Sequence, residues 1–397
     1  MLTKIHTIAS NNNGISKRQP NMSIKSILLW RILPGITLSV ACFIGYLLQH
    51  ELPLGLFFTI IIPLSKGILP PAIFGHGKMK GTPPVPDDYP PQRRPQNEMF
   101  LTLPGSGDKM PQNGIGMCCR PTAYDDELVY RSTLWYLLLG GRHIDTAQLY
   151  LNSKAVGRGI REAMRRGIKR EEIFLTSKIF PTHYGYESTI KVVQSELDDL
   201  GLEYFDLFLL HFPSLGPLRV SPCSKEGKGA SQCRKETWQA LTELRNNGLI
   251  RNAGVSNFVI KHIQELEELT DVAPIANNQI SFNPFVPEKT METVKYCHKQ
   301  NITVTAYMPL GGDVHRNLVH RKLARLSTQL DKSVTQIMLR WALQSGCAVI
   351  PGTGNPNHMR ENLDVYEIEL SDDDMRQIDE LKYDAKGYFD MDMSKFD

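Results

Sequence analysis

From about residue 113 onward, short apolar runs alternate with longer segments whose apolar residues recur at helical spacing. The apolar runs have the length and composition of strands, and they lie near residues 113–117, 142–145, 173–178, 204–211, 250–255, 275–280, 302–307 and 347–351. Helical patterns fill the intervals at 123–139, 153–166, 187–200, 237–247, 259–269, 288–300 and 333–344. Eight alternations of this kind predict a parallel (β/α)8 barrel.

A doubly wound sheet is the alternative fold for an alternating chain. That fold binds dinucleotides through a G-x-G-x-x-G turn, which opens a helix directly after a strand. No such motif follows any predicted strand here. The barrel is therefore favoured.

Four polar, titratable residues stand at or just after the ends of predicted strands. Asp145 ends one run and Tyr150 follows it closely, while Lys178 and His211 end the next two runs. Because the carboxyl ends of barrel strands converge on one face, we expect these side chains to meet there and form a proton-transfer site. Each one alone could instead be a strand-end ion pair, a core tyrosine or a satisfied histidine.

Several ordered motifs carry a family resemblance. They are Arg142-His-Ile-Asp145 to Tyr150, Ser177-Lys178, Leu209-Leu-His211-Phe-Pro213, Gly254-Val-Ser-Asn257-Phe258, Asn278-Gln279, Thr305-Ala-Tyr307-Met-Pro-Leu310, and Val349-Ile-Pro351 to Glu361-Asn362. Together they resemble the aldo-keto reductases, in that family's order, over about Phe100 to Asp397. The resemblance implies a (β/α)8 barrel that reduces an aldehyde or ketone to an alcohol.

The resemblance also implies roles for the four strand-end residues. Tyr150 would be the general acid. A free tyrosine, with a pKa of about 10, gives up its proton poorly at neutral pH, so a nearby cation is needed to favour the phenolate. Lys178 would supply that cation, and Asp145 would pair with it, since burying an unpaired ammonium is costly. His211 would orient the substrate carbonyl and share in proton delivery.

The cofactor implied by the resemblance is a nicotinamide dinucleotide. Ser256, Asn257 and Gln279 match residues that hydrogen-bond the nicotinamide carboxamide, and Tyr307 matches the ring that stacks on the nicotinamide. The further residues assigned to the cofactor site are Leu310, Thr353, His358, Glu361 and Asn362, of which the last two match residues near the adenine. No metal is expected.

Two departures from the family pattern leave questions open. Many members have a lysine and an arginine that grip the 2′-phosphate of NADPH, where this chain has Gly352 and His358. Thr353 can still donate to a phosphate, and His358 or Arg360 could replace the arginine, so NADPH is expected and NADH stays possible. In the substrate pocket, tryptophans of many members are replaced by Cys118, Phe180 and Phe212, which predicts an apolar and roomier pocket.

Outside the resemblance, the first part of the chain divides by composition. We expect a polar tail over 1–26, an apolar membrane anchor over 27–75, a Pro-rich linker over 76–98 and the barrel over 99–397. The anchor is either one span or a hairpin, and a buried core helix is the alternative. Lys and Arg flank the apolar runs on both outer sides, which places the barrel in the cytosol.

Composition excludes some partners and leaves others open. The net charge is +3 and there is no extended Lys/Arg tract, so we expect no nucleic acid. The seven cysteines lack C-x-x-C spacing and are expected to be free thiols in a reducing compartment. Residues 213–236 are expected to form a solvated active-site loop, and the barrel is expected to be monomeric with a small-molecule carbonyl substrate. The alternative function is a cofactor-binding, redox-sensing regulatory subunit of a membrane protein.

Overall fold

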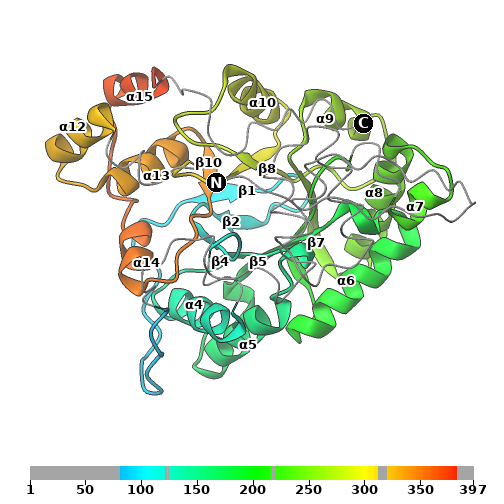
Figure 1. The fold of residues 1–397 in the computed structure, drawn as a ribbon, viewed down its shortest axis with the longest axis horizontal. Coiled ribbons are helices and arrows are strands. Elements are labelled where there is room, and N and C mark those ends of the chain that lie inside the picture. Colours follow the sequence, from blue (N-terminus) through cyan, green and yellow to red (C-terminus); the bar gives the residue numbers. More distant parts are fainter. Residues whose placement is uncertain (1–80, 121–122, 124, 216–219, 312–319, 382–397) are drawn as a thin grey trace, which may run out of the picture. The chain divides into compact units, whose positions relative to one another are not determined.

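The computed structural model describes residues 81–120, 123, 125–215, 220–311 and 320–381. Eight parallel strands form its central sheet, at the places that the apolar runs predict (Figure 1). They are β3 (Gly114–Gly116), β4 (His143–Asp145), β5 (Phe174–Ile179), β6 (Phe205–Leu210), β7 (Ile250–Ser256), β8 (Asn277–Ser281), β9 (Thr303–Tyr307) and β10 (Cys347–Val349). The predicted strands are therefore confirmed in number, order and direction.

The sheet closes on itself. The strands follow chain order from β3 to β10, and a parallel bridge between Asn113 and Val349 joins the two edges. The amide of Gly116 also donates to the carbonyl of Pro351 across the same seam, at 3.3 Å. The register pairs Asp145 with Thr176, so Asp145 and Lys178 lie near the same end of the barrel.

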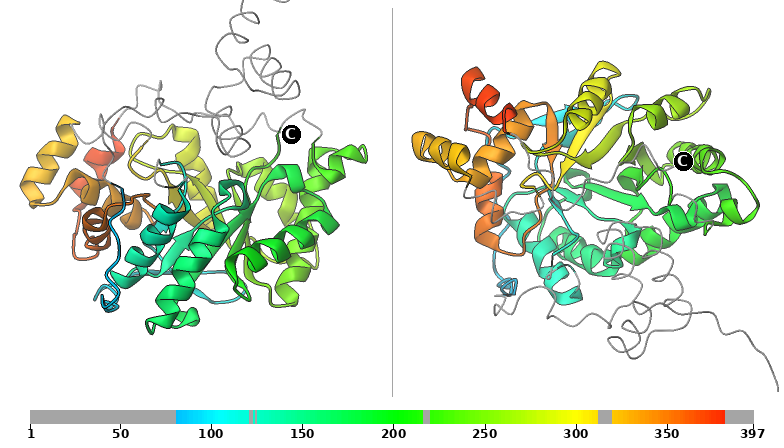
Figure 2. Two further views of the ribbon diagram at one scale, coloured as in Figure 1. Left: turned by 60° about the horizontal axis from the view of Figure 1, so that its bottom comes forward. Right: turned by 45° about the horizontal axis from the view of Figure 1, so that its top comes forward.

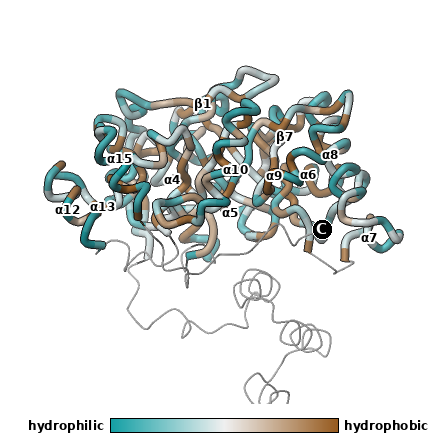
Figure 3. Tube along the Cα trace, turned by 90° about the horizontal axis from the view of Figure 1, so that it is seen from above, coloured by the Kyte–Doolittle hydropathy of each residue, from teal (hydrophilic) through white to brown (hydrophobic). Residues whose placement is uncertain are grey.

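Helices surround the strands (Figures 1 and 2). Those that alternate with the strands are α4 (Asp126–Leu138), α5 (Ser153–Arg165), α6 (Tyr186–Leu200), α8 (Ala230–Asn246), α9 (Ile260–Glu267), α10 (Glu288–Lys299), α13 (Val334–Gln344) and α14 (Pro356–Leu363). Hydrophobic and hydrophilic residues alternate along the helices, and the outer α7 (Pro222–Lys225) and α12 (Arg321–Leu330) are mostly hydrophilic (Figure 3). This is the pattern expected when each helix buries one apolar stripe.

One contact shows why a glycine lies in α5. A Cβ built on Gly157 would lie 2.1 Å from the carbonyl oxygen of Leu200, the last residue of α6. Only a residue without a side chain allows the two helices to approach this closely. Gly157 therefore fixes the packing of α5 on α6.

A short antiparallel hairpin, β1 (Phe100–Thr102) and β2 (Lys109–Pro111), precedes the barrel. Leu103 and Met110 from this hairpin are fully buried in one cluster with side chains of the strands. The strand members of the cluster and the residue preceding β8 are Phe174, Leu207, Leu209, Ala276 and Ala348. The hairpin, which the sequence did not predict, therefore covers the amino ends of the strands.

Residues 81–98, part of the predicted Pro-rich linker, form no helix or strand. They lie against α4, where Trp135 Nε1 donates to the carbonyl of Pro83 at 3.0 Å. The ring of Tyr89 packs edge-on against Trp135, with ring centroids 4.8 Å apart. The predicted tail and anchor, 1–26 and 27–75, lie outside the described residues. Within the described part of the chain, no helix is long and apolar enough to cross a membrane.

The segment predicted as an active-site loop, 213–236, is partly helical instead. A four-residue helix, α7 (Pro222–Lys225), lies within it, and α8 begins at Ala230 rather than near Thr237. The sequence did not predict these helices because the segment is rich in Gly and Lys. In the structure, Gly229 is the N-cap of α8, and Lys228 pairs with Glu226 and Glu236 at 2.9 and 2.7 Å. Three further helices were also missed, namely α12 (Arg321–Leu330), α14 and α15 (Asp372–Asp379).

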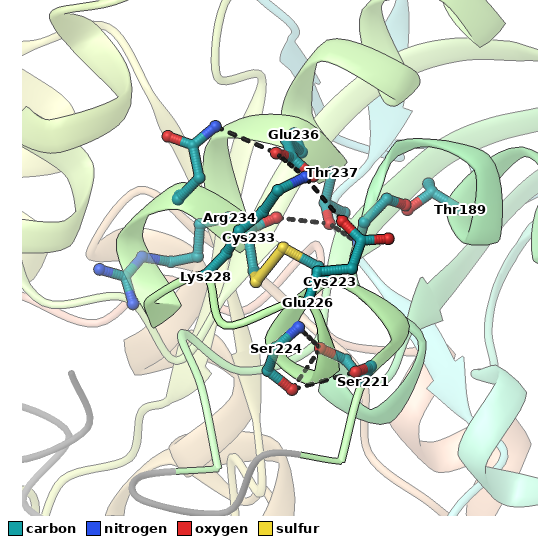
Figure 4. The surroundings of a disulfide bond; sticks show 12 residues. Thr189, Ser221, Cys223, Ser224, Glu226, Lys228, Cys233, Arg234, Glu236 and Thr237 are labelled. Carbon is teal, nitrogen blue, oxygen red and sulfur yellow. Dashed lines mark hydrogen bonds and ion pairs between the residues drawn. A yellow bond between two sulfur atoms is a disulfide. The ribbon is translucent and has the colours of Figure 1, made fainter.

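The prediction of free thiols is wrong for two pairs of cysteines. Cys223 on α7 is bonded to Cys233 on α8, with their Cα atoms 5.7 Å apart (Figure 4). Cys118 and Cys119 are bonded as well, while Cys297 and Cys347 are free and buried. Spacing alone could not reveal the first pair, because the turn at 226–229 brings α7 back onto α8.

Candidate active site

Asp145, Lys178 and Tyr150 lie in contact at the carboxyl ends of β4 and β5. Lys178 Nζ donates to Asp145 Oδ1 at 2.6 Å and to the carbonyl of Thr146 at 2.8 Å, and it lies 3.3 Å from the phenol oxygen of Tyr150. Lys178 is fully buried, and Asp145 is 2% exposed. Burial lowers the pKa of Lys178, and the charge and hydrogen bond of Asp145 oppose that shift.

His211 follows β6 and completes the group that the sequence predicts. Its ring meets that of Tyr150 edge-on, with centroids 5.7 Å apart. Burial, and then the charge of Lys178, hold the pKa of His211 well below its ordinary value. The imidazole is therefore neutral at physiological pH. Its Nδ1 is buried and has no hydrogen-bond partner within the described part of the chain.

The turn that carries Tyr150 is held by a side chain of the same motif. Asn152 Nδ2 donates to the carbonyl of Met117 at 2.8 Å, and Asn152 Oδ1 accepts from Thr146 Oγ1 at 2.9 Å. Leu151 between them has φ 53°, in the left-handed region that costs a non-glycine residue energy. The asparagine therefore fixes the loop of the candidate proton donor to the end of β3.

Ser256, Asn257, Gln279 and Tyr307 come together, Gln279 from the middle of β8 and the others from the ends of β7 and β9. Tyr307 donates its hydroxyl to Asn257 Oδ1 at 2.7 Å, and Asn257 Nδ2 donates to the carbonyl of His211 at 2.9 Å. Gln279 Nε2 donates to Asp145 Oδ2 at 2.7 Å, which links this group to the lysine pair. The cluster of hydroxyl and amide groups beside an aromatic ring fits a carboxamide-bearing ring such as nicotinamide.

The other residues assigned to the cofactor lie on or near α14, apart from Leu310, which is partly buried after β9. Thr353 Oγ1 accepts from the amide of Asn355, just before the helix begins. His358 is exposed, Glu361 is half-buried and Asn362 is buried. Asn362 Oδ1 has no partner among the described residues. A buried acceptor of this kind fits an adenine amino group.

The predicted substrate-pocket residues divide into two places. Phe180 and Phe212 pack edge-on with ring centroids 5.9 Å apart, and Phe212 stacks on His211 at 4.9 Å. Cys118 lies instead after the end of β3, bonded to Cys119, and is half-buried. The two phenylalanines therefore form an apolar wall beside His211, and their role in a substrate pocket stays a prediction.

Sequence reasoning missed one polar pair beside this wall. Gln148 Oε1 accepts from the amide of Phe180 at 3.2 Å, and Gln148 Nε2 lies 3.1 Å from His183 Nδ1. Gln148 lies within the Asp145–Tyr150 motif, so its position in the sequence could have indicated that it belongs to the site. His183 lies on a short 3-10 turn, Pro181–His183, that carries no sequence periodicity.

Comparison with known proteins agrees with this geometry. A family model described as "Aldo/keto reductase family" matches residues 114–382. The chain belongs to the aldo-keto reductase family. The predicted resemblance is therefore confirmed.

Curated relatives include several named reductases. The 9,11-endoperoxide prostaglandin H2 reductase of Trypanosoma cruzi is 35% identical over 279 residues, covering 70% of this chain and 90% of that protein. The glyoxal reductase of Bacillus subtilis is 38% identical over 248 residues, covering 62% and 81%. As an aldo-keto reductase, this protein falls within a family of oxidoreductases that reduce carbonyl compounds.

Solved structures show the same likeness. A Bombyx mori aldo-keto reductase in complex with NADP superposes with a TM-score of 0.64 at 30% identity, covering 73% of this chain and 94% of that one. An aldo-keto reductase from a deep-sea metagenome library superposes with a TM-score of 0.61 at 31% identity, covering 70% and 93%. These similarities support a nicotinamide cofactor for this aldo-keto reductase.

Proposed function

We propose that this aldo-keto reductase reduces an aldehyde or ketone to an alcohol, with Tyr150 as the proton donor. The observation that carries the proposal is the 3.3 Å approach of Lys178 Nζ to the Tyr150 oxygen, in a site where the lysine is fully buried. An ammonium in a low-dielectric site stabilises the phenolate left behind when the tyrosine gives up its proton.

The nicotinamide cofactor, when bound, supplies the hydride. Ser256, Asn257 and Gln279 would hold its carboxamide, and the ring of Tyr307 would stack on the nicotinamide. Burial raises the pKa of Tyr307, which stays protonated and donates to Asn257. The reacting proton is therefore assigned to Tyr150 and not to Tyr307.

His211 orients the substrate carbonyl through a hydrogen bond. Because its pKa lies well below the ordinary value, the imidazole carries no excess proton at neutral pH. It acts as a neutral donor rather than as an acid that delivers a proton. Phe180 and Phe212 exclude water from the same side of the site and favour an apolar substrate.

NADPH is the proposed cofactor, with NADH as the competing one. Thr353 precedes α14 and His358 lies in its first turn, where the helix dipole favours a phosphate. Gly352 and His358 stand where many members have the lysine and arginine that bind the 2′-phosphate. Glu361 and Asn362 lie one turn further along, on the side assigned to the adenine.

Steady-state oxidation of NADPH with a panel of aldehydes and ketones tests the proposal. An enzyme of this kind releases oxidised cofactor and cycles, and its rate depends on the carbonyl compound. Tight retention of the oxidised cofactor, with no cycling on any carbonyl in the panel, would overturn the enzymatic assignment in favour of a cofactor-sensing subunit.

We further propose that residues 27–75 anchor the barrel to a membrane, with the barrel in the cytosol. Support comes from the uncharged run Ile32–Leu48, the second run Leu52–Ser65 and the Lys and Arg residues that flank both. Protease treatment of sealed microsomes is the test. Digestion of a barrel that pellets with membranes supports the proposal, and protection until detergent is added contradicts it.

A further inference from the structure

Cys118 and Cys119 are adjacent in the chain and bonded to each other just after the end of β3. Cys118 is half-buried and Cys119 is exposed, whereas Cys223 and Cys233 of the other disulfide are both buried. Exposure is what lets a reductant approach a disulfide. Of the two disulfides in the described part of the chain, Cys118–Cys119 is therefore the one that a reductant can reach while the protein stays folded.

The bond between these adjacent residues adds little to stability. A disulfide stabilises a fold mainly by restricting the unfolded chain, and the effect grows with the number of residues in the closed loop. Cys223 and Cys233 are ten residues apart, but Cys118 and Cys119 enclose no residue between them. In the cytosol, where the barrel is proposed to lie, disulfides are usually transient and serve catalysis or redox sensing. The exposed bond thus suits a chemical role better than a structural one.

The backbone at this disulfide holds the turn that carries Tyr150. The carbonyl of Met117 belongs to the peptide bond that joins Met117 to Cys118, and it accepts from Asn152 Nδ2 at 2.8 Å. Asn152 Oδ1 accepts in turn from Thr146 Oγ1 at 2.9 Å. A rotation of the peptide next to Cys118 therefore moves the acceptor that fixes the loop of the candidate proton donor.

The backbone of Cys119 is in a conformation that cysteine rarely adopts. Its φ is 61°, in the left-handed region that favours glycine. The disulfide joins its side chain to that of Cys118 and so restricts the backbone of both residues. On the other side, Arg120 Nη1 donates to the carbonyl of Gly116 and lies 3.1 Å from a Cβ built on Gly352, across the seam of the barrel. Opening the disulfide removes the restriction at Cys119, and the peptide groups on either side of Cys118 are then free to turn.

We propose that Cys118–Cys119 is a thiol–disulfide exchange site, opened by a dithiol reductant, that controls how firmly Tyr150 is held for catalysis. This inference rests on the proposed function. A thiolate of the reductant attacks the sulfur of Cys119, the more exposed residue, and forms a mixed disulfide, while Cys118 leaves as a thiolate and takes up a proton. The second thiol of the reductant attacks its own sulfur in the mixed disulfide and releases Cys119 as a thiol. Two electrons and two protons pass to the cysteine pair, and the reductant becomes a disulfide.

The bonded form is the more active one. In it the Met117 carbonyl and Asn152 hold the turn on which the Tyr150 oxygen lies 3.3 Å from Lys178 Nζ. A small displacement of a reacting group is costly to the rate, so opening the bond should lower kcat about tenfold or more. The wall of Phe180 and Phe212 lies on other loops, so KM should change less.

Thiol trapping and kinetics on the full-length protein test the inference together. The protein is equilibrated with mixtures of reduced and oxidised dithiothreitol, its thiols are trapped with iodoacetamide, and peptide mass spectrometry identifies the alkylated cysteines. We expect Cys118 and Cys119 to open at a reductant ratio at least about tenfold lower than Cys223 and Cys233. The fall in kcat, measured after the same treatments, should follow the opening of Cys118–Cys119.

Serine variants separate the two disulfides. Cys119→Ser cannot form the exposed bond, so its kcat should equal that of the reduced wild type and should not respond to the reductant. Cys223→Ser is the matched control, because it lacks only the buried bond and should keep the response of kcat. Amide hydrogen exchange measures the turn directly, and the amides of residues 147–151 should exchange faster in reduced wild type and in Cys119→Ser than in the bonded protein.

Other outcomes overturn the inference. Alkylation of Cys118 and Cys119 in protein that has met no reductant would show that the bond does not form. Opening of the pair without a change in kcat or in amide exchange at the turn would show that it does not control Tyr150, and loss of the response in Cys223→Ser would assign it to the buried bond. If Cys119→Ser does not fold by thermal melting, Cys118→Ser and the reductant series on the wild type give the same comparison. A wild-type protein that turns over in neither state would refute the proposed function, while trapping and amide exchange would still decide this inference.

Discussion

Lys178 Nζ lies 3.3 Å from the phenol oxygen of Tyr150, yet its two shorter hydrogen bonds go elsewhere. Asp145 Oδ1 accepts at 2.6 Å and the Thr146 carbonyl at 2.8 Å. The ammonium is thus positioned by groups that do not react. Its place does not depend on the tyrosine hydroxyl, so the hydroxyl can be removed without moving the charge.

The first prediction is that Tyr150→Phe abolishes turnover and leaves cofactor affinity nearly intact. The change removes only the proton donor, so kcat should fall by at least about 100-fold while the dissociation constant of NADPH changes little. Steady-state rates and fluorescence titration measure the two quantities. Turnover at the wild-type rate in this variant would refute the mechanism.

The second prediction concerns stability as well as rate. Lys178→Met should abolish turnover and lower the free energy of unfolding by about 3 kcal/mol, because it leaves the buried carboxylate of Asp145 without its cation. The double variant Asp145→Asn, Lys178→Met should be more stable than Lys178→Met alone. Urea denaturation measures both, and equal stability of the single and double variants would show that the buried charge is not the cause.

The third prediction concerns cofactor choice. If Thr353 and His358 hold the 2′-phosphate, NADPH should bind at least about tenfold more tightly than NADH, a difference of about 1.4 kcal/mol. Replacing Gly352 with lysine should widen that preference, although Arg120 must shift by a few tenths of an ångström to admit the new side chain. Titrations with both cofactors provide the measurement. Equal dissociation constants in the wild-type protein would mean that the site accepts either cofactor.

The strands and the four residues Asp145, Tyr150, Lys178 and His211 were predictable because one physical rule governs both. A barrel strand buried on both faces is a short apolar run, and a polar residue at its end marks the reacting face. Asp145, Lys178 and His211 satisfy that rule, and the structure brings them together with Tyr150. Local pattern and final fold agree at these positions, so the sequence alone was sufficient.

Arg120 and the start of α8 were not predictable for a different reason. Arg120 lies beside Gly352, which is distant in sequence and meets it only where the barrel closes. The first turns of α8 carry few apolar residues and follow a glycine, so they resemble a loop until Cys233 and Arg234 are seen to be buried. Such contacts arise from tertiary structure and leave no periodicity in the sequence.

The fourth prediction concerns the bond between Cys223 and Cys233. Cross-linking residues ten apart should contribute about 2–3 kcal/mol to the free energy of unfolding, by restricting the unfolded chain. Cys223→Ser should lose that amount in oxidising buffer and lose little in dithiothreitol, where the wild-type bond is reduced too. Cys297→Ser, which alters a free buried cysteine, is the control. A difference of the same size in both buffers would mean that packing and not the bond is responsible.

The same variant should affect substrate binding more than chemistry. The amide of Cys223 donates to the carbonyl of Tyr184, whose hydroxyl donates in turn to the carbonyl of Phe212. Loosening α7 should therefore disturb the apolar wall and raise KM more than it lowers kcat. A fall in kcat with unchanged KM would argue against this connection.

The fifth prediction concerns Glu196 on α6, which is 8% exposed and accepts from Ser153 Oγ at 2.7 Å. Burial raises its pKa to about 7, against the opposing effect of the Ser153 hydrogen bond, and the charge of Asp199 adds to the rise. The native state therefore binds more protons than the unfolded chain between the ordinary carboxyl pKa and about pH 7. Stability should fall as the pH rises through that window, since ionising this carboxyl costs more in the folded protein.

Glu196→Gln removes that ionisation while keeping an acceptor for Ser153. The variant should be more stable than the wild type at pH 8, by at most about 3 kcal/mol, and the gain should shrink toward pH 5. Glu203→Gln, at an exposed position next to α6, is the matched control and should show no such trend. Urea denaturation at several pH values measures the difference. A gain that is the same at pH 5 and pH 8 would mean that Glu196 does not titrate in this range.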